Sequence, residues 1–305
     1  MPPEIRDRIT GLVIPPAWKE VWICPWPNGH IQAVGFDAAG RRQYLYHPRW
    51  REKRDKAKHD HVLDFAAALP DARKIVIAQL DGRGLTRERV LAAAVRLLDL
   101  GFFRVGGERY AEDNGTYGLA TLRREHVSFT RGQIMFSYLA KHSVERVQAV
   151  ADPQVVRVVR ALKARPEPGE ALFAYRRDET WHEVHSAEIN AHLKELTGLD
   201  VSAKDFRTWN ATVLAAVGLA VSPVSRKSAS SRKRAVARVV TEVSQYLGNT
   251  PAVCRASYID PRVFDRYDRG DTIADALDQL GGPDSGALAI QGPIEEAVLR
   301  LLRPG

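Results

Sequence analysis

The feature that most constrains the fold of this chain is a change of hydrophobic pattern across a strongly basic stretch, residues 49–58. Before it, short β-favouring runs are separated by turn residues; after it, apolar residues recur at helical spacing. The basic stretch is polar and poor in core residues, so we expect a domain boundary within it. The pattern predicts a small β-rich domain over residues 1–56 and a larger domain over residues 57–305. The predicted strands of the small domain cover residues 18–24, 30–36 and 41–47.

The larger domain is predicted to be mainly helical, with one antiparallel sheet. Thr86 can cap a helix that ends before Gly101, and Asp152 can cap a second helix. A third helix is expected from Ser186 to Gly198. Between the first two helices, residues 127–130, 133–139 and 144–150 read as a three-stranded meander, and Lys141 lies at the tip of its second hairpin. The fold class expected is therefore α+β.

The last hundred residues contain further helix signals. Ser202 and Asp205 have the spacing of a capping box, which places Arg207 near the start of a helix. Residues 222–234 are small, polar and basic, and we expect a loop there. A helix follows from residue 235 and ends at Gly248, and the next one opens at residues 250–251 and carries Tyr258. Residues 260–305 are expected to form short helices.

The charge and cysteine content limit the classes of partner and compartment. Lys and Arg total 45 against 37 Asp and Glu, a formal net charge of +8, which favours a polyanionic partner such as nucleic acid. The chain has two cysteines, Cys24 and Cys254, and no Cys-x-x-Cys pair, which indicates a reducing compartment and excludes a cysteine-rich zinc site. No apolar stretch suits a signal peptide or a membrane span. We therefore expect a cytoplasmic protein with no membrane partner.

Common cofactor and catalytic signatures are missing from the sequence. We find no phosphate-binding GxxxxGK[ST] loop, no GxGxxG after a strand, no HExxH and no GxSxG. His59, Asp60 and His61 could suggest a metal site, but in so charged a stretch a solvated surface is the better interpretation. We expect neither a metal nor a nucleotide cofactor.

The positions that could carry chemistry are scattered along the larger domain. They are Arg104 in GFFRVG (101–106), Lys141 at its hairpin tip, Arg207 in KDFRTW (204–209), and the segments GNTP (248–251) and RASY (255–258). Each has an ordinary explanation when taken alone: a buried ion pair, a turn lysine, or a tyrosine that packs a helix against the core.

Together these segments resemble the type IB DNA topoisomerases, specifically their small bacterial and poxviral branch. The resemblance extends over nearly the whole chain and includes GRRQYLY (40–46), NGTYGL (114–119) and TLRREH (121–126). It implies a catalytic domain with the fold shared by type IB topoisomerases and tyrosine recombinases. It also implies relaxation of supercoiled DNA through a 3′-phosphotyrosyl intermediate, without ATP or metal.

The family pattern implies a role for each of five residues. Tyr258 matches the nucleophile, Arg104 and Arg207 match two arginines that stabilise the transition state, and Lys141 matches the general acid. Where many relatives have histidine, this chain has Asn249. A side-chain amide can donate a hydrogen bond to a phosphate oxygen as an imidazole can, but it cannot carry a titrating charge.

The resemblance also implies how duplex DNA is held. A monomer is expected to close as a clamp around the duplex, and the protein is expected to be associated with the nucleoid. The strand that includes Gln43, Tyr44 and Tyr46 matches a segment that faces the major groove, although alternation does not place all three on one face. Arg41 and Arg42 are also expected to bind DNA, and Lys204 can reach a base edge or a phosphate near the scissile bond. Other basic residues are expected to contact phosphates, namely Arg51, Lys53, Arg54, Lys56, Lys58, Arg226, Lys227, Arg232, Lys233 and Arg234.

Two other functions share part of this pattern. A tyrosine recombinase uses the same chemistry but usually carries His-x-x-Arg around the second arginine, where this chain has Lys204 to Arg207. An inactive DNA-binding relative is the other alternative, suggested by Asn249. The intact catalytic residues oppose it, namely Arg104, Lys141, Arg207 and Tyr258.

Overall fold

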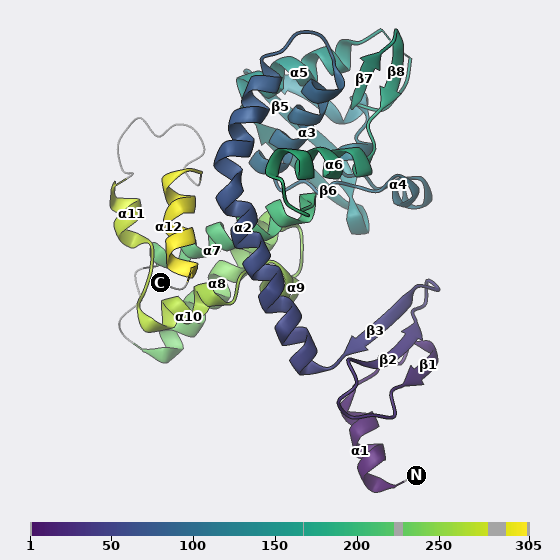
Figure 1. Ribbon diagram of the computed structural model, residues 1–305, viewed down its shortest axis with the longest axis vertical. Coiled ribbons are helices and arrows are strands. Elements are labelled where there is room, and N and C mark those ends of the chain that lie inside the picture. Colours follow the sequence, from purple (N-terminus) through teal and green to yellow (C-terminus); the bar gives the residue numbers. More distant parts are fainter. Residues whose placement is uncertain (1, 167, 223–227, 280–290, 304–305) are drawn as a thin grey trace. The chain divides into compact units, whose positions relative to one another are not determined.

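The computed structural model describes residues 2–166, 168–222, 228–279 and 291–303. It divides into two compact units, Met1–His61 and Val62–Gly305, each of which can be followed in Figure 1. The division falls inside helix α2 (Pro48–Leu80), somewhat later than the sequence-predicted boundary after residue 56.

Helix α2 corrects two expectations about the basic stretch. Residues 49–58, within which we expected the domain boundary, form part of this continuous helix, because Arg, Lys, Glu and Ala all favour helices and an exposed helix needs no apolar face. The expected solvated surface at residues 59–61 is also wrong in part, because His59 is buried.

Unit 1 is a three-stranded antiparallel sheet in the order β1-β2-β3, preceded by a short helix. The central strand carries the buried residues Gln32 and Ala33, and Gly35 lets the ring of Trp18 lie against its backbone. The three strands confirm the β-rich prediction, whereas the N-terminal helix was not predicted. The elements are α1 (Pro3–Gly11), β1 (Lys19–Ile23), β2 (Ile31–Phe36) and β3 (Arg42–Tyr46).

Unit 2 is mainly helical, and helix α3 (Arg87–Leu100) lies in the middle of its core. Most of α3 is buried, since it packs against α5, α6, α7 and β7. Its predicted cap is confirmed: Thr86 Oγ1 accepts from the Arg89 amide at 3.4 Å. The cap of α5 is confirmed as well, because Asp152 Oδ1 accepts the amides of Gln154 and Val155, both at 3.0 Å. Nearby elements are α4 (Glu108–Asn114), η1 (Leu119–Thr121), η2 (Arg124–His126), α5 (Pro153–Ala164), β7 (Ala174–Arg177), β8 (Thr180–Glu183) and α6 (Ser186–Thr197).

The predicted meander is confirmed as the sheet β4-β5-β6. Ala140 pairs with Val144 at the end of the second hairpin, and the 3-10 turn η3 (Lys141–Ser143) joins the two strands. Lys141 therefore occupies the exposed hairpin tip that the sequence predicts. The strands are β4 (Val127–Thr130), β5 (Gln133–Ala140) and β6 (Val144–Val150).

The remaining helices pack around α7, which is buried over most of its length. Figure 1 shows α8, α10 and α12 beside it. The expected loop over residues 222–234 is wrong from residue 229 onward, where α8 begins; Ser228 caps this helix by accepting the Ser231 amide at 3.2 Å. Among the described residues, no helix has the length and apolarity needed to cross a bilayer. These helices are α7 (Ala203–Ala220), α8 (Ala229–Leu247), α9 (Pro251–Ser257), α10 (Arg262–Arg269), α11 (Ala274–Gln279) and α12 (Pro293–Leu302).

A buried ionic network attaches the C-terminal helix to this core. Arg73 on α2 bonds Asp99 on α3 at 2.7 Å and Glu295 on α12 at 2.5 Å. Glu295 also accepts from Trp209 Nε1 on α7 at 2.8 Å. Burial alone would lower the pKa of Arg73, but its bonds to Glu295 and Asp99 outweigh this effect and raise it. The network joins four helices, and one of them carries Arg207.

We expect Glu295→Ala to lower the free energy of unfolding by about 3 kcal/mol, because it leaves buried donors of Arg73 and Trp209 without their acceptor. Chemical denaturation monitored by circular dichroism measures this loss. The matched control is Glu296→Ala, whose exposed pair with Arg300 should contribute less than about 1 kcal/mol. Equal effects of the two substitutions would contradict a stabilising role for the network.

Candidate active site

The end of helix α8 is the structural centre of the site. Gly248 adopts a left-handed conformation with φ of 62°, which favours glycine. Its amide bonds the Gln245 carbonyl at 3.1 Å, and the Asn249 amide bonds the Ser244 carbonyl at 3.0 Å. These two backbone hydrogen bonds form the pattern of a Schellman cap. It turns the chain sharply, so the carbonyls of the last helical turn face outward as acceptors.

Arg104 lies on this cap. Its Nη2 donates to the Gly248 carbonyl at 3.0 Å and to Asn249 Oδ1 at 2.7 Å. The Asn249 amide is thereby oriented, with its oxygen toward the guanidinium. Its Nδ2 is buried and has no hydrogen-bond partner within the described chain. A buried donor without an acceptor is costly, and a bound anion would satisfy it.

The backbone of Arg104 is held by a close contact between two glycines. The Arg104 carbonyl accepts the Leu119 amide at 2.8 Å. A Cβ added to Gly118 would lie 2.5 Å from Gly106 Cα and 2.8 Å from the Arg104 oxygen. Only glycine fits at residue 118, and the two backbone segments lock the position from which the Arg104 side chain extends.

Arg207 reaches the same helix end from α7. Its guanidinium donates to the Leu247 carbonyl at 2.8 Å and to the Phe102 carbonyl at 2.6 Å, and the residue is 4% exposed. Burial and the nearby Arg104 together lower the pKa of Arg207 to about 10, although Tyr258 opposes the change. The group therefore remains charged at neutral pH.

Tyr258 lies beside Arg207. The Arg207 Cζ is 5.3 Å from the centre of the Tyr258 ring, and the ring is half-buried rather than enclosed in the core. The sequence placed Tyr258 within a helix, but it is the residue that follows α9 and its backbone is no longer helical. Its carbonyl accepts a bond from Thr212 Oγ1 at 3.4 Å, which attaches the tyrosine segment to α7.

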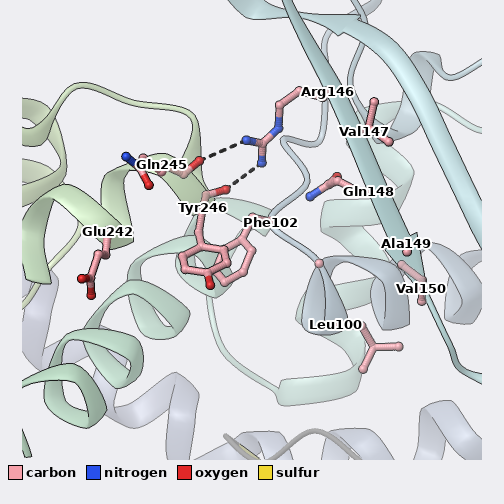
Figure 2. A pocket seen from close by; sticks show the side chains of 11 residues that line it. Leu100, Phe102, Arg146, Val147, Gln148, Ala149, Val150, Glu242, Gln245 and Tyr246 are labelled. Carbon is pink, nitrogen blue, oxygen red and sulfur yellow. Dashed lines mark hydrogen bonds between the residues drawn. The ribbon is translucent and has the colours of Figure 1, made fainter. Parts of the chain in front are cut away.

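A third arginine, Arg146 on β6, also binds the end of α8. Its Nη2 donates to the Tyr246 carbonyl at 2.7 Å and its Nη1 to the Gln245 carbonyl at 3.3 Å. Figure 2 shows both bonds at the rim of a groove of about 660 Å³. Sequence reasoning missed Arg146, because nothing local distinguishes it from the other basic residues of the chain.

The three guanidiniums form one cluster. Arg146 Nη1 and Arg104 Nη1 both lie within 4 Å of the point where a Cβ of residue 248 would stand. Burial lowers the pKa of Arg146, and Arg104 lowers it further. Within the described residues, no carboxylate pairs with Arg104, Arg146 or Arg207. Such a concentration of positive charge is suited to a phosphate diester.

Lys141 is at the hairpin tip, and no interaction found in the described part of the chain joins it to these arginines. The structure therefore brings together Arg104, Arg207, Asn249 and Tyr258, and leaves Lys141 exposed on the connection between β5 and β6. No group of three potential metal ligands occurs among the described residues.

The predicted groove-facing strand of unit 1 presents an aromatic surface. Tyr44 stacks on Tyr46 with ring centres 6.0 Å apart, and Tyr46 stacks on Trp50 at 4.5 Å. Gln43 instead bonds Asp37 at 2.9 Å, as Arg41 does at 2.8 Å. The two tyrosines thus share one face and Gln43 belongs to the other, in agreement with the expected alternation.

The predicted phosphate contacts are mostly exposed. Those on α2 and α7 are exposed except Lys58, which is half-buried. Arg42 is exposed, with its guanidinium 6.0 Å from the Tyr44 ring. Arg232 pairs with Asp268 at 3.5 Å and is helical, as are Lys233 and Arg234. Arg226 and Lys227 lie outside the described residues.

Two families match this chain. Residues 47–279 match the family described as eukaryotic DNA topoisomerase I, catalytic core, and residues 2–37 match the N-terminal domain of bacterial DNA topoisomerase IB. The chain is 29% identical to DNA topoisomerase 1B of Acanthamoeba polyphaga mimivirus over 86% of this chain and 79% of that protein. It is 22% identical to DNA topoisomerase 1B of vaccinia virus (strain Copenhagen) over the same shares. It is also 32% identical to DNA topoisomerase 1 of Daucus carota, over 42% of this chain and 15% of that protein.

We expect Gly118→Ala to lower the free energy of unfolding by about 2 kcal/mol, because the methyl group meets backbone atoms that cannot move aside. Thermal and urea denaturation measure the loss. Gly107→Ala is the matched control: its Cβ would enter open space, and the change should stay below about 1 kcal/mol. If Gly118→Ala is as stable as the parent, the backbone of Arg104 is not held by this contact.

Proposed function

Because the chain belongs to the type IB DNA topoisomerase family, we propose that it relaxes supercoiled duplex DNA by reversible cleavage of one strand at Tyr258. The observation that carries this proposal is the position of the half-buried Tyr258 ring beside Arg207, on the same helix end as Arg104 and Asn249. A phenol, two guanidiniums and an amide then meet around one phosphate.

The reaction exchanges one phosphodiester for another. Tyr258 Oη forms a bond to the scissile phosphorus as the bond from phosphorus to the 5′ oxygen breaks, which leaves a 3′-phosphotyrosyl bond and a free 5′ hydroxyl. The phenol loses its proton to solvent as the new bond forms. The 5′ hydroxyl reverses the attack after strand rotation, so the bond energy is conserved and ATP is not required.

The arginines and Asn249 act on the phosphate oxygens. In the transition state negative charge builds on the non-bridging oxygens, and fixed donors aimed at them lower the barrier. Arg104 and Arg207 each donate some of their N–H groups to carbonyls at the end of α8, and their remaining N–H groups can donate to the phosphate. The unpartnered Asn249 Nδ2 provides one more donor.

Lys141 is assigned to protonate the leaving 5′ oxygen. An alkoxide is a poor leaving group, and a general acid contributes about 10²- to 10⁴-fold in rate. The exposed hairpin tip leaves the ammonium free to approach the bound DNA. This residue is the one member of the proposed set that must be brought to the phosphate by substrate binding.

DNA binding is assigned to both units. The stacked Tyr44 and Tyr46 with neighbouring basic side chains would follow a groove of the duplex, and Lys204 would contact the DNA near the scissile bond. We propose that the protein acts as a monomer that closes as a clamp around the duplex. Its place of action would be the cytoplasm, in association with the nucleoid.

We expect the parent protein to relax supercoiled plasmid in EDTA without ATP, and Tyr258→Phe to relax none, because the phenol oxygen is the atom that bonds phosphorus. Agarose gels measure relaxation. Tyr246→Phe, a change at an exposed tyrosine, is the matched control and should remain active. Relaxation by Tyr258→Phe at the parent rate would overturn the proposal, and so would a requirement for paired recombination sites.

We expect Asn249→Ala to slow single-turnover cleavage by about 10²-fold, in line with the loss of one oxyanion donor. Asn249→His restores a donor and should remain within about tenfold of the parent. Rapid-quench measurement of covalent adduct formation gives both rates. If the alanine variant cleaves as fast as the parent, the amide does not act on the phosphate.

A further inference from the structure

Arg146 connects two parts of the site that are far apart in the sequence. It lies on β6, which begins directly after the turn that carries Lys141. Its two hydrogen bonds end on the carbonyls of Gln245 and Tyr246, in the last turn of α8. Figure 2 shows the guanidinium extended from the strand to this helix end. One side chain thus links the hairpin of Lys141 to the helix that leads to Asn249.

The position of Arg146 costs electrostatic free energy, which would not be needed if its hydrogen bonds served only to stabilise the fold. The guanidinium is half-buried close to that of Arg104, so the two charges repel. A neutral donor could bond the same carbonyls without that repulsion. The forked guanidinium of an arginine, however, donates to two successive carbonyls at once. It therefore fixes the orientation of β6 relative to the end of α8 as well as the distance between them.

We propose that Arg146 is a positioning residue for Lys141: its fork on the α8 carbonyls sets where the β5–β6 hairpin delivers the general acid relative to the phosphate site. The inference rests on the proposed function, because it requires Lys141 to protonate the 5′ oxygen. Without the fork, the hairpin loses its attachment to α8, and Lys141 spends less time in reach of the leaving oxygen.

The test uses the leaving group to separate proton delivery from charge stabilisation. The cleavage site is first mapped with the parent protein, and a duplex is then made with sulfur in place of the 5′ bridging oxygen at that site. A thiol has a pKa of about 8.5, far below that of an alcohol, so it leaves as a thiolate without a proton donor. A defect in general acid catalysis disappears on this substrate, whereas a defect in phosphate binding remains.

We expect Arg146→Ala to cleave the ordinary duplex about 10- to 100-fold more slowly than the parent. On the sulfur duplex it should cleave within about threefold of the parent, as Lys141→Ala should. Arg146→Lys keeps the charge but cannot span both carbonyls, so we expect it to show the same pattern. Asn249→Ala should stay slow on both substrates. Thermal melts establish that each variant is folded, and Arg300→Ala, an exposed ion-paired arginine, is the control for loss of charge.

Each contrary result has a distinct meaning. If Arg146→Ala cleaves the ordinary duplex at the parent rate, or stays equally slow on the sulfur duplex, the positioning role is overturned while the proposed function stands. Full activity of Arg146→Lys would overturn it as well, because charge alone would then suffice. If the parent forms no covalent adduct, the proposed function itself fails and this inference falls with it. If Lys141→Ala is not restored by sulfur, Lys141 is not the general acid, and the inference falls while cleavage at Tyr258 stands.

Discussion

The arrangement of the site depends on the carbonyls at the end of helix α8. Four successive backbone oxygens, from Gln245 to Gly248, accept bonds from three guanidiniums. A helix C-terminus carries a partial negative charge of about half an electron, which favours cations there. This charge offsets part of the repulsion among Arg104, Arg146 and Arg207, and it leaves an excess of positive charge that a DNA phosphate can neutralise. The same carbonyls fix the direction of each fork before any substrate arrives.

The rest of unit 2 holds these three arginines in position at the end of α8. Arg207 is carried by the buried helix α7, which the ionic network of Arg73 and Glu295 ties to α2, α3 and α12. Arg104 is fixed through its backbone by the contact between Gly106 and Gly118. Arg146 comes from the meander and is the member that couples the hairpin to the cluster. Helix α12 thus supports α7 through the bond between Glu295 and Trp209.

The sequence predicts those features that depend on local chemistry. The caps at Thr86 and Asp152, the meander and the exposed tip at Lys141 follow from short patterns, and the structure confirms them. The helicity of residues 49–58 and the start of α8 at Ala229 were missed, because charged helix formers resemble a linker when no apolar face marks the helix. The convergence of the arginines came from a family resemblance. Arg146 could not be found at all, because its acceptors lie about a hundred residues further along the chain.

The most direct test of the account is to identify the atom that bonds DNA. The protein is incubated with duplex in EDTA, denatured, treated with nuclease and then with trypsin, and the peptides are weighed by mass spectrometry. We expect a nucleotide remnant on the peptide of residues 256–262, whose one tyrosine is Tyr258. A remnant on any other peptide, or none on a protein that still relaxes DNA, would contradict the claim that this phenol and the α8 arginines act on one phosphate.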